Sequence, residues 1–144
     1  MIRAVKYEKS CGIVVVNGSN ILLLHYPSGH WDFPKGHVDG AETEHETAIR
    51  ELFEETAIKD IDFIHGFRYA TSYHYRRNRH IFQKKVVYFL GKTQQNTVTI
   101  SHEHQDYIWL GWEEAKEKIT FDNSRFILQE AHDFWLKNKH NIST

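Results

Sequence analysis

The sequence predicts an α/β protein, in the α+β sense of one mixed sheet lying between helices. Short apolar runs bounded by turn residues occur in both halves of the chain, and two longer segments have helical periodicity. The 144 residues also contain no repeat, low-complexity tract or linker. We therefore expect one domain over residues 1–144, built around one core.

A β-hairpin is expected near the start of the chain. Residues 10–16 form an apolar run typical of a buried strand, and Asn-Gly-Ser-Asn at 17–20 is a turn sequence. Residues 21–26 are expected to return as the second strand. Cys11 lies in the first run and is expected in the core; as the only cysteine it has no disulfide partner within the chain.

A helix is expected to begin at Thr43, because Thr43 and Glu46 have the spacing of a capping box. Ile49, Leu52 and Phe53 are expected to bury on one side of this helix against the sheet. The later elements are expected as strands at 61–75, 81–92, 97–100 and 107–111, a charged turn at 76–79, a short helix at 112–118, and a last helix from about 122 with the buried stripe Ile127, Ala131, Phe134 and Trp135.

The segment from 36 to 58 contains the most chemical information, reading Gly-x5-Glu-x7-Arg-Glu-Leu-x-Glu-Glu-x-Ala-Ile. Glu51, Glu54 and Glu55 stand at i, i+3 and i+4, which places three carboxylates on one helix face. Crowded carboxylates repel one another by a few tenths of a kcal/mol per pair. Hard divalent cations relieve that repulsion, so the face predicts a Mg²⁺ site, with Mn²⁺ as a second possibility. The alternative is an ordinary solvated acidic face.

Basic and aromatic side chains around this segment suggest phosphate and base binding. Lys35 and His37 flank Gly36 and are expected to face phosphate oxygens. The segment 73–80 mixes aromatic rings with cations and is followed by Lys84 and Lys85. Rings stack on bases and cations bind phosphates, but a solubilising hairpin tip explains the same composition.

Composition limits the expected partners. The net charge of −1 gives no global attraction to nucleic acid, so no stable nucleic-acid complex is expected. The sequence has no secretory leader pattern and no apolar run near the ~18 residues of a membrane span. A soluble cytoplasmic protein without a membrane partner is therefore expected.

The string from 36 to 58 is similar to the signature of the Nudix hydrolases, which cleave nucleoside diphosphates linked to another moiety. It departs from that signature at Ala57, where the family usually has glycine. The resemblance implies an α/β/α sandwich with the acidic helix on one face. It also implies that Glu54 and Glu55 are the central metal ligands and that the Gly36 carbonyl adds a further oxygen. Arg50 then either orients the carboxylates or is an ordinary intrahelical partner, and Glu42 is its partner or a helix N-terminal acid.

The run Ser-His-Glu-His-Gln-Asp-Tyr at 101–107 resembles the C-terminal signature of the asymmetric dinucleoside tetraphosphate hydrolases within the Nudix superfamily. The resemblance implies Mg²⁺-dependent cleavage of diadenosine tetraphosphate to ATP and AMP, by attack of a metal-activated water on a phosphoanhydride. It implies that Glu103 is a metal ligand or general base, and that Lys35 stabilises the leaving group. Tyr73 would stack on an adenine, and Tyr107 would flank the same pocket.

Two alternatives remain at this point. An RNA 5′-pyrophosphohydrolase, or another Nudix hydrolase of nucleoside polyphosphates, shares the Trp-x-Phe-Pro-x-Gly lead-in at 31–36 and a similar acidic helix. A non-enzymatic nucleotide-binding module could use the same fold. The run at 101–107 favours the dinucleotide enzyme over the first, and the intact acidic face argues against the second.

Overall fold

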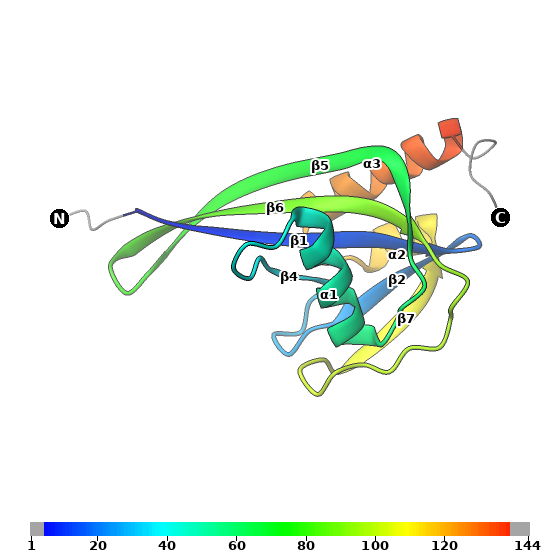
Figure 1. Ribbon diagram of the computed structural model, residues 1–144, viewed down its shortest axis with the longest axis horizontal. Coiled ribbons are helices and arrows are strands. Elements are labelled where there is room, and N and C mark those ends of the chain that lie inside the picture. Colours follow the sequence, from blue (N-terminus) through cyan, green and yellow to red (C-terminus); the bar gives the residue numbers. More distant parts are fainter. Residues whose placement is uncertain (1–4, 139–144) are drawn as a thin grey trace.

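A mixed sheet forms the centre of the molecule in a computed structural model that describes residues 5–138 (Figure 1). Within that range the sheet has seven strands, ordered β3-β2-β1-β6-β5, with β4 added beside β1 and β7 beside β2. The strands are β1 (Val5–Asn17), β2 (Asn20–His25), β3 (Trp31–Asp32), β4 (Lys35–His37), β5 (Asp62–Arg77), β6 (His80–Lys92) and β7 (Asp106–Gly111). β1 and β6 run parallel, whereas the other pairs are antiparallel. The predicted mixed sheet and N-terminal hairpin are confirmed.

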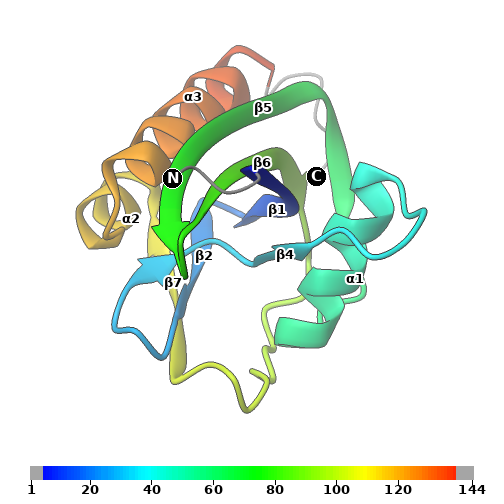
Figure 2. The same cartoon turned by 90° about the vertical axis from the view of Figure 1, so that its left-hand side faces the viewer.

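Helices cover both faces of this sheet. Helix α1 (Glu44–Thr56) lies on one side, and α2 (Trp112–Lys118) and α3 (Asp122–Asn138) lie on the other (Figure 2). Successive residues of a strand point to opposite faces, so Ile13 packs in the core under α1 and Val14 in the core under α2 and α3. This arrangement is the α/β/α sandwich that the resemblance implied. Among residues 5–138, no helix combines the length and the hydropathy that a membrane crossing requires.

The β5–β6 hairpin forms a long ribbon that extends beyond the helices together with the start of β1 (Figure 1). Arg77 pairs with His80 across a two-residue turn. Asn78 and Arg79 both have positive φ, 52° and 65°, which is the backbone of a type I′ turn. The predicted charged turn is therefore confirmed, and it is tightened to two residues.

The strand expected at 97–100 is not present. This stretch runs along the C-terminal end of α1, where the Thr99 N–H donates to the Thr56 carbonyl at 2.9 Å and the Ser101 N–H donates to the Glu55 carbonyl at 3.1 Å. The last carbonyls of a helix lack intrahelical donors. The loop supplies those donors, so its backbone is satisfied without a strand partner.

The predicted buried side of α1 is wrong in part. Leu52 is buried as expected, but Ile49 and Phe53 are 44% and 45% exposed. Glu55 instead lies on the inner side, in line with Ala48 and Leu52. The sheet packs against the helix face that includes the carboxylate, and this turns the two apolar side chains outward.

Candidate active site

The acidic helix α1 is held at its N-terminus by local and long-range contacts. Both halves of the predicted capping box are present: the Glu46 N–H donates to Thr43 Oγ1 at 3.1 Å, and the Thr43 N–H donates to Glu46 Oε1 at 2.8 Å. Glu44 forms ion pairs with Lys9 of β1 at 2.6 Å and with Arg68 of β5 at 2.8 Å. These contacts tie the first turn of the helix to two strands of the sheet.

Arg50 organises the acids of the helix. Its Nε donates to Glu42 at 2.6 Å, and its Nη1 donates to Glu51 at 2.8 Å and to Glu54 at 2.6 Å. Its Nη2 donates to the His37 carbonyl at 2.9 Å. The Arg50 hydrogen bond is the largest of the effects that lower the pKa of Glu42 to about 2. Because Arg50 links the preceding turn with two helix acids, its geometry is that of a residue that orients carboxylates.

Gly36 and Glu51 lie in direct contact. A Cβ at Gly36 would overlap the Glu51 carboxyl group, so only glycine leaves room for the acid at this point of β4. Glu51 is half-buried, and burial, followed by the charges of Glu54 and Glu103, raises its pKa against the opposing effect of Arg50. The structure therefore brings the predicted Gly36 backbone and Glu51 carboxylate together.

Glu55 is the most buried of the predicted metal ligands, at 7% exposed. Its Oε1 accepts a hydrogen bond from the Lys35 N–H at 3.1 Å. Burial is the main cause that raises its pKa to about 9, followed by the negative charge of Glu51; Glu103 adds a smaller effect in the same direction. A carboxyl group in this position is stabilised in its charged form by a cation.

Glu103 comes from a loop 48 positions after Glu55 and is brought to the same cluster by the fold. The Ser101–Glu55 backbone hydrogen bond docks the loop on α1, and the His104 N–H then donates to the Ser101 carbonyl at 3.0 Å. The charge of Glu103 raises the pKa of both Glu51 and Glu55. Glu103 is exposed, so its carboxylate is accessible to a ligand.

The chemistry of the donor set fits a divalent cation, although its side chains are too far apart to hold an ion as they stand. Among residues 5–138, no three His, Cys, Asp or Glu side chains are placed to hold an ion as they stand. Arg50 accounts for part of this, since its ion pairs engage Glu51 and Glu54. Carboxylate and carbonyl oxygens are the ligands of hard cations, and the raised pKa of buried Glu55 indicates that its charged form is poorly compensated by its surroundings.

Lys35 lies beside this cluster, and Lys84 lies near Lys35. Lys35 Nζ is 3.4 Å from Asp32 Oδ2, and Asp32 is buried, with Oδ1 accepting from the Phe33 N–H at 2.8 Å. Burial, and after it the charge of Lys35, lowers the pKa of half-buried Lys84. Lys35 and Lys84 therefore share one region. Asp32 was not among the predicted site residues, although its position three residues before Lys35 could have indicated this ion pair.

The predicted base-binding residues are only partly brought together. Tyr73 is 40% exposed and pairs directly with Lys84, so both side chains lie on one face of the ribbon. Lys85 points to the opposite face, where it pairs with Lys9 of β1. Tyr107 pairs with Leu24 and is partly buried against the core under α1. Alternation along the strands therefore places Lys85 and Tyr107 on the opposite face of the sheet from Tyr73, and their roles in substrate binding stay predictions.

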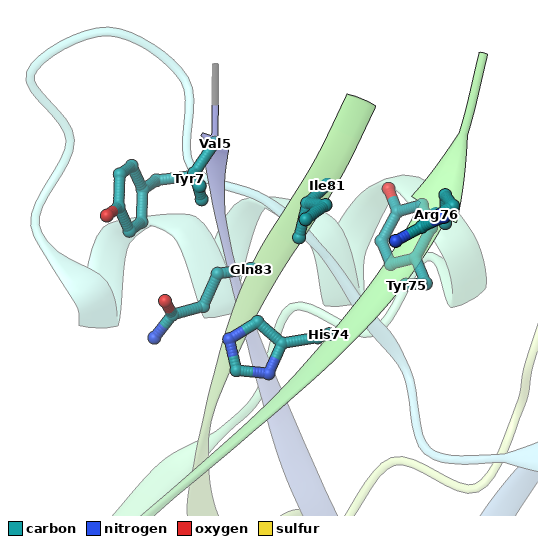
Figure 3. A pocket seen from close by; sticks show the side chains of 7 residues that line it. All are labelled: Val5, Tyr7, His74, Tyr75, Arg76, Ile81 and Gln83. Carbon is teal, nitrogen blue, oxygen red and sulfur yellow. The ribbon is translucent and has the colours of Figure 1, made fainter. Parts of the chain in front are cut away.

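A shallow groove of about 610 Å³ lies near the end of the ribbon (Figure 3). It is lined by Val5, Tyr7, His74, Tyr75, Arg76, Ile81 and Gln83. None of the predicted metal ligands belongs to this lining. His74 and Arg76 of the groove lie on the opposite face of β5 from Tyr73, whereas Tyr75 lies on the same face as Tyr73.

Comparison with known proteins identifies the family of this chain. A family model described as "NUDIX domain" matches residues 6–129. The asymmetrical bis(5′-nucleosyl)-tetraphosphatase of Mus musculus is 39% identical over 142 residues, covering 88% of this chain and 94% of that protein. The solved structure titled "Crystal Structure of a C. elegans Ap4A Hydrolase Binary Complex" has a TM-score of 0.79 and 31% identity, and covers 90% of this chain and 98% of that one. An RNA pyrophosphohydrolase of Baumannia cicadellinicola is 34% identical over 77 residues, or 51% of this chain and 48% of that protein. The chain belongs to the NUDIX family and is a Nudix hydrolase.

Proposed function

We propose that this hydrolase cleaves bis(5′-nucleosyl) tetraphosphates, splitting diadenosine tetraphosphate into ATP and AMP. The observation on which the proposal depends is the buried Glu55 carboxylate, crowded by Glu51 and Glu103 beside Lys35. A divalent cation would compensate the crowded negative charge of this cluster, next to a side chain suited to phosphate binding. The names of the mouse relative and of the C. elegans structure support the choice of substrate.

The cation would be held by the carboxylates of Glu51, Glu54, Glu55 and Glu103 and by the Gly36 carbonyl. A bound Mg²⁺, or Mn²⁺ in its place, would neutralise phosphate charge and make a water molecule more nucleophilic. Arg50 orients Glu51 and Glu54 through its ion pairs.

The other side chains would act on the substrate and on the attacking water. Lys35, Lys84 and His37 would bind phosphate oxygens, with Lys35 stabilising the charge that develops on the leaving group. Exposed Glu103 would take the proton of the attacking water if it is not a ligand. Tyr73 would stack on one base. The single-domain organisation and the cytoplasmic location expected from the sequence stay predictions.

The pyrophosphohydrolase alternative is the weaker one. Its relatives are 34% identical over about half of the chain or 28% identical over 93% of it, whereas the tetraphosphatase relative is 39% identical over 88% of it. The docked loop that contains Glu103 also matches the signature of the dinucleotide enzymes.

The test is a parallel assay of the purified protein with Mg²⁺ on diadenosine tetraphosphate and on 5′-triphosphorylated RNA, with products separated by chromatography. We expect ATP and AMP from the dinucleotide. Glu55→Gln should lower turnover by about 10²-fold or more through the metal site. Glu113→Gln removes an acid whose side chain is 76% exposed on α2, and it should leave turnover unchanged. Two molecules of ADP, or faster cleavage of the RNA, would reject the proposal.

A further inference from the structure

His104 lies buried behind the acidic cluster without a role in the site described so far. The residue is 7% exposed, and its ring meets Tyr26 edge-on, with 4.7 Å between centroids. On one side, Nδ1 is 2.9 Å from Ser101 Oγ. On the other side, Nε2 is buried and has no hydrogen-bond partner among residues 5–138.

The unpaired nitrogen faces a metal-binding carboxylate. Nε2 lies 3.7 Å from Glu55 Oε2, slightly beyond hydrogen-bond length, so a small side-chain shift would join them. Leaving a buried polar atom without a partner is unfavourable, because its lost hydration is not replaced, and this favours closing the gap. The other carboxylate oxygen, Oε1, already accepts from the Lys35 N–H.

The neighbouring serine can pair with the form of the ring that suits this contact, because a hydroxyl can donate to Nδ1 as well as accept from it. A neutral imidazole has one N–H and one acceptor nitrogen. When the Ser101 hydroxyl donates to Nδ1, the hydrogen resides on Nε2 and points toward the Glu55 carboxylate. The other tautomer would direct a lone pair at the negative oxygen.

We propose that His104 is a positioning residue for Glu55. It donates its Nε2 hydrogen to Oε2 while the Lys35 N–H holds Oε1. Donors on both oxygens fix the plane of the carboxylate and leave one lone pair on each oxygen for a divalent cation. The inference rests on the proposed metal site and adds a residue that touches neither the ion nor the substrate.

The first experiment measures Mn²⁺ binding to the substrate-free protein by electron paramagnetic resonance of the free ion. His104→Leu keeps an apolar side chain in the space but removes the donor, and it should weaken binding about 10- to 100-fold. His104→Gln places an amide nitrogen near the position of Nε2 and should restore most of the affinity. His102→Leu changes the exposed histidine of the same loop and serves as the matched control. Equal affinity of His104→Leu and wild type, or equal losses in His104→Leu and His104→Gln, would overturn the proposal.

The second experiment needs no metal and no variant of His104. Long-range ¹H–¹⁵N spectra of the wild type, recorded above the Glu55 pKa of about 9 so that the carboxylate is charged without a metal, should show the Nε2–H tautomer of this ring, and Glu55→Gln should move its signals. A Nδ1–H tautomer would contradict the inference. The two proposals fail in different ways: a wild type that binds no Mn²⁺ rejects the metal site itself. Binding that is lost in Glu55→Gln but kept in His104→Leu rejects only the role of His104.

Discussion

Glu55 shows most clearly how a single residue connects stability with function. A buried carboxylate among other acids opposes folding in its charged form, because burial removes its hydration and its neighbours repel it. As the proposed metal ligand, the same carboxylate would bind a cation strongly, because the cation would supply the missing charge. The cost to stability and the predicted catalytic role therefore have one physical origin.

The pH dependence of stability should report this cost. The pKa of Glu55 is raised from its ordinary value of 4.5 to about 9. Between these values the folded state keeps a proton that the unfolded state has released, so this group lowers the unfolding free energy as pH rises. Glutamine does not titrate. In metal-free buffer, the unfolding free energy of Glu55→Gln relative to wild type should therefore increase by about 1–3 kcal/mol as the pH rises from ~5 to ~8.

The measurement is urea unfolding across that pH range in the presence of a chelator. Glu113→Gln, on the exposed side of α2, should show no such gain and serves as the control. A constant difference between Glu55→Gln and wild type at every pH would show that Glu55 does not titrate as inferred.

Helix α1 is the element on which the site is built, and each of its ends has a specific cap. Its first turn is fixed by the capping box and by the Glu44 ion pairs. At its other end Ala57 adopts a left-handed conformation, with φ 62° and ψ 16°. This is the position at which the sequence departs from the family's usual glycine. A side chain with a Cβ is strained in this region of conformational space.

Ala57→Gly should therefore stabilise the protein by about 1 kcal/mol, because glycine adopts the left-handed cap without strain. The Ala57 N–H to Phe53 carbonyl bond of 2.8 Å should persist. Chemical unfolding gives the free-energy change, and turnover should stay close to that of wild type. Ala48→Gly, in the buried interior of the same helix, should instead destabilise by about 1 kcal/mol or more. A loss of stability in Ala57→Gly would contradict the strain argument.

The assembly of the molecule determines which distant residues meet. The sheet places Tyr73 of β5 and Lys84 of β6 on a common face, and the charge of Lys35 reaches Lys84. The loop after β6 brings Glu103 to α1 from the opposite half of the chain. Under the proposed function, base binding involves the β5–β6 ribbon and the hydrolysis step involves α1 and the Glu103 loop. Mutations in the two parts should therefore change the Michaelis constant and the turnover separately.

Tyr73→Ala should raise the Michaelis constant for diadenosine tetraphosphate by about 5- to 150-fold, the equivalent of about 1–3 kcal/mol for one lost stacking contact. Turnover at saturation should fall much less. Steady-state kinetics test this, with Tyr7→Ala as the control, because Tyr7 is 75% exposed at the start of β1 beside the ribbon. If Tyr73→Phe is as damaging as Tyr73→Ala, the hydroxyl is responsible and stacking is the wrong explanation.

Glu103→Gln should lower turnover strongly, by about 10²-fold, since Glu103 is proposed as a ligand or general base. Its unfolding free energy should stay within ~0.5 kcal/mol of wild type, because the side chain is exposed on a loop. A ligand role predicts partial rescue by raised Mg²⁺ or Mn²⁺, whereas a general-base role predicts loss of the acidic limb of the pH–rate profile. Wild-type turnover in this variant would remove Glu103 from the site.

Local patterns were sufficient to predict the elements and the composition of the acidic helix. The Thr43–Glu46 capping box, the 17–20 turn and the helix at 112–118 appear where expected, because each depends on residues close in sequence. The spacing of Glu51, Glu54 and Glu55 likewise follows from helix geometry alone.

Only the tertiary structure decided which side chains are buried and which loops meet. It turned Glu55 inward and left Ile49 and Phe53 outside, because the sheet, and not the apolar pattern, selected the contact face of α1. It used the 97–101 backbone to satisfy the end of α1, and this placed Glu103 and His104 beside Glu55. Such contacts depend on packing between residues some 50 positions apart, for which a single sequence has no local signal.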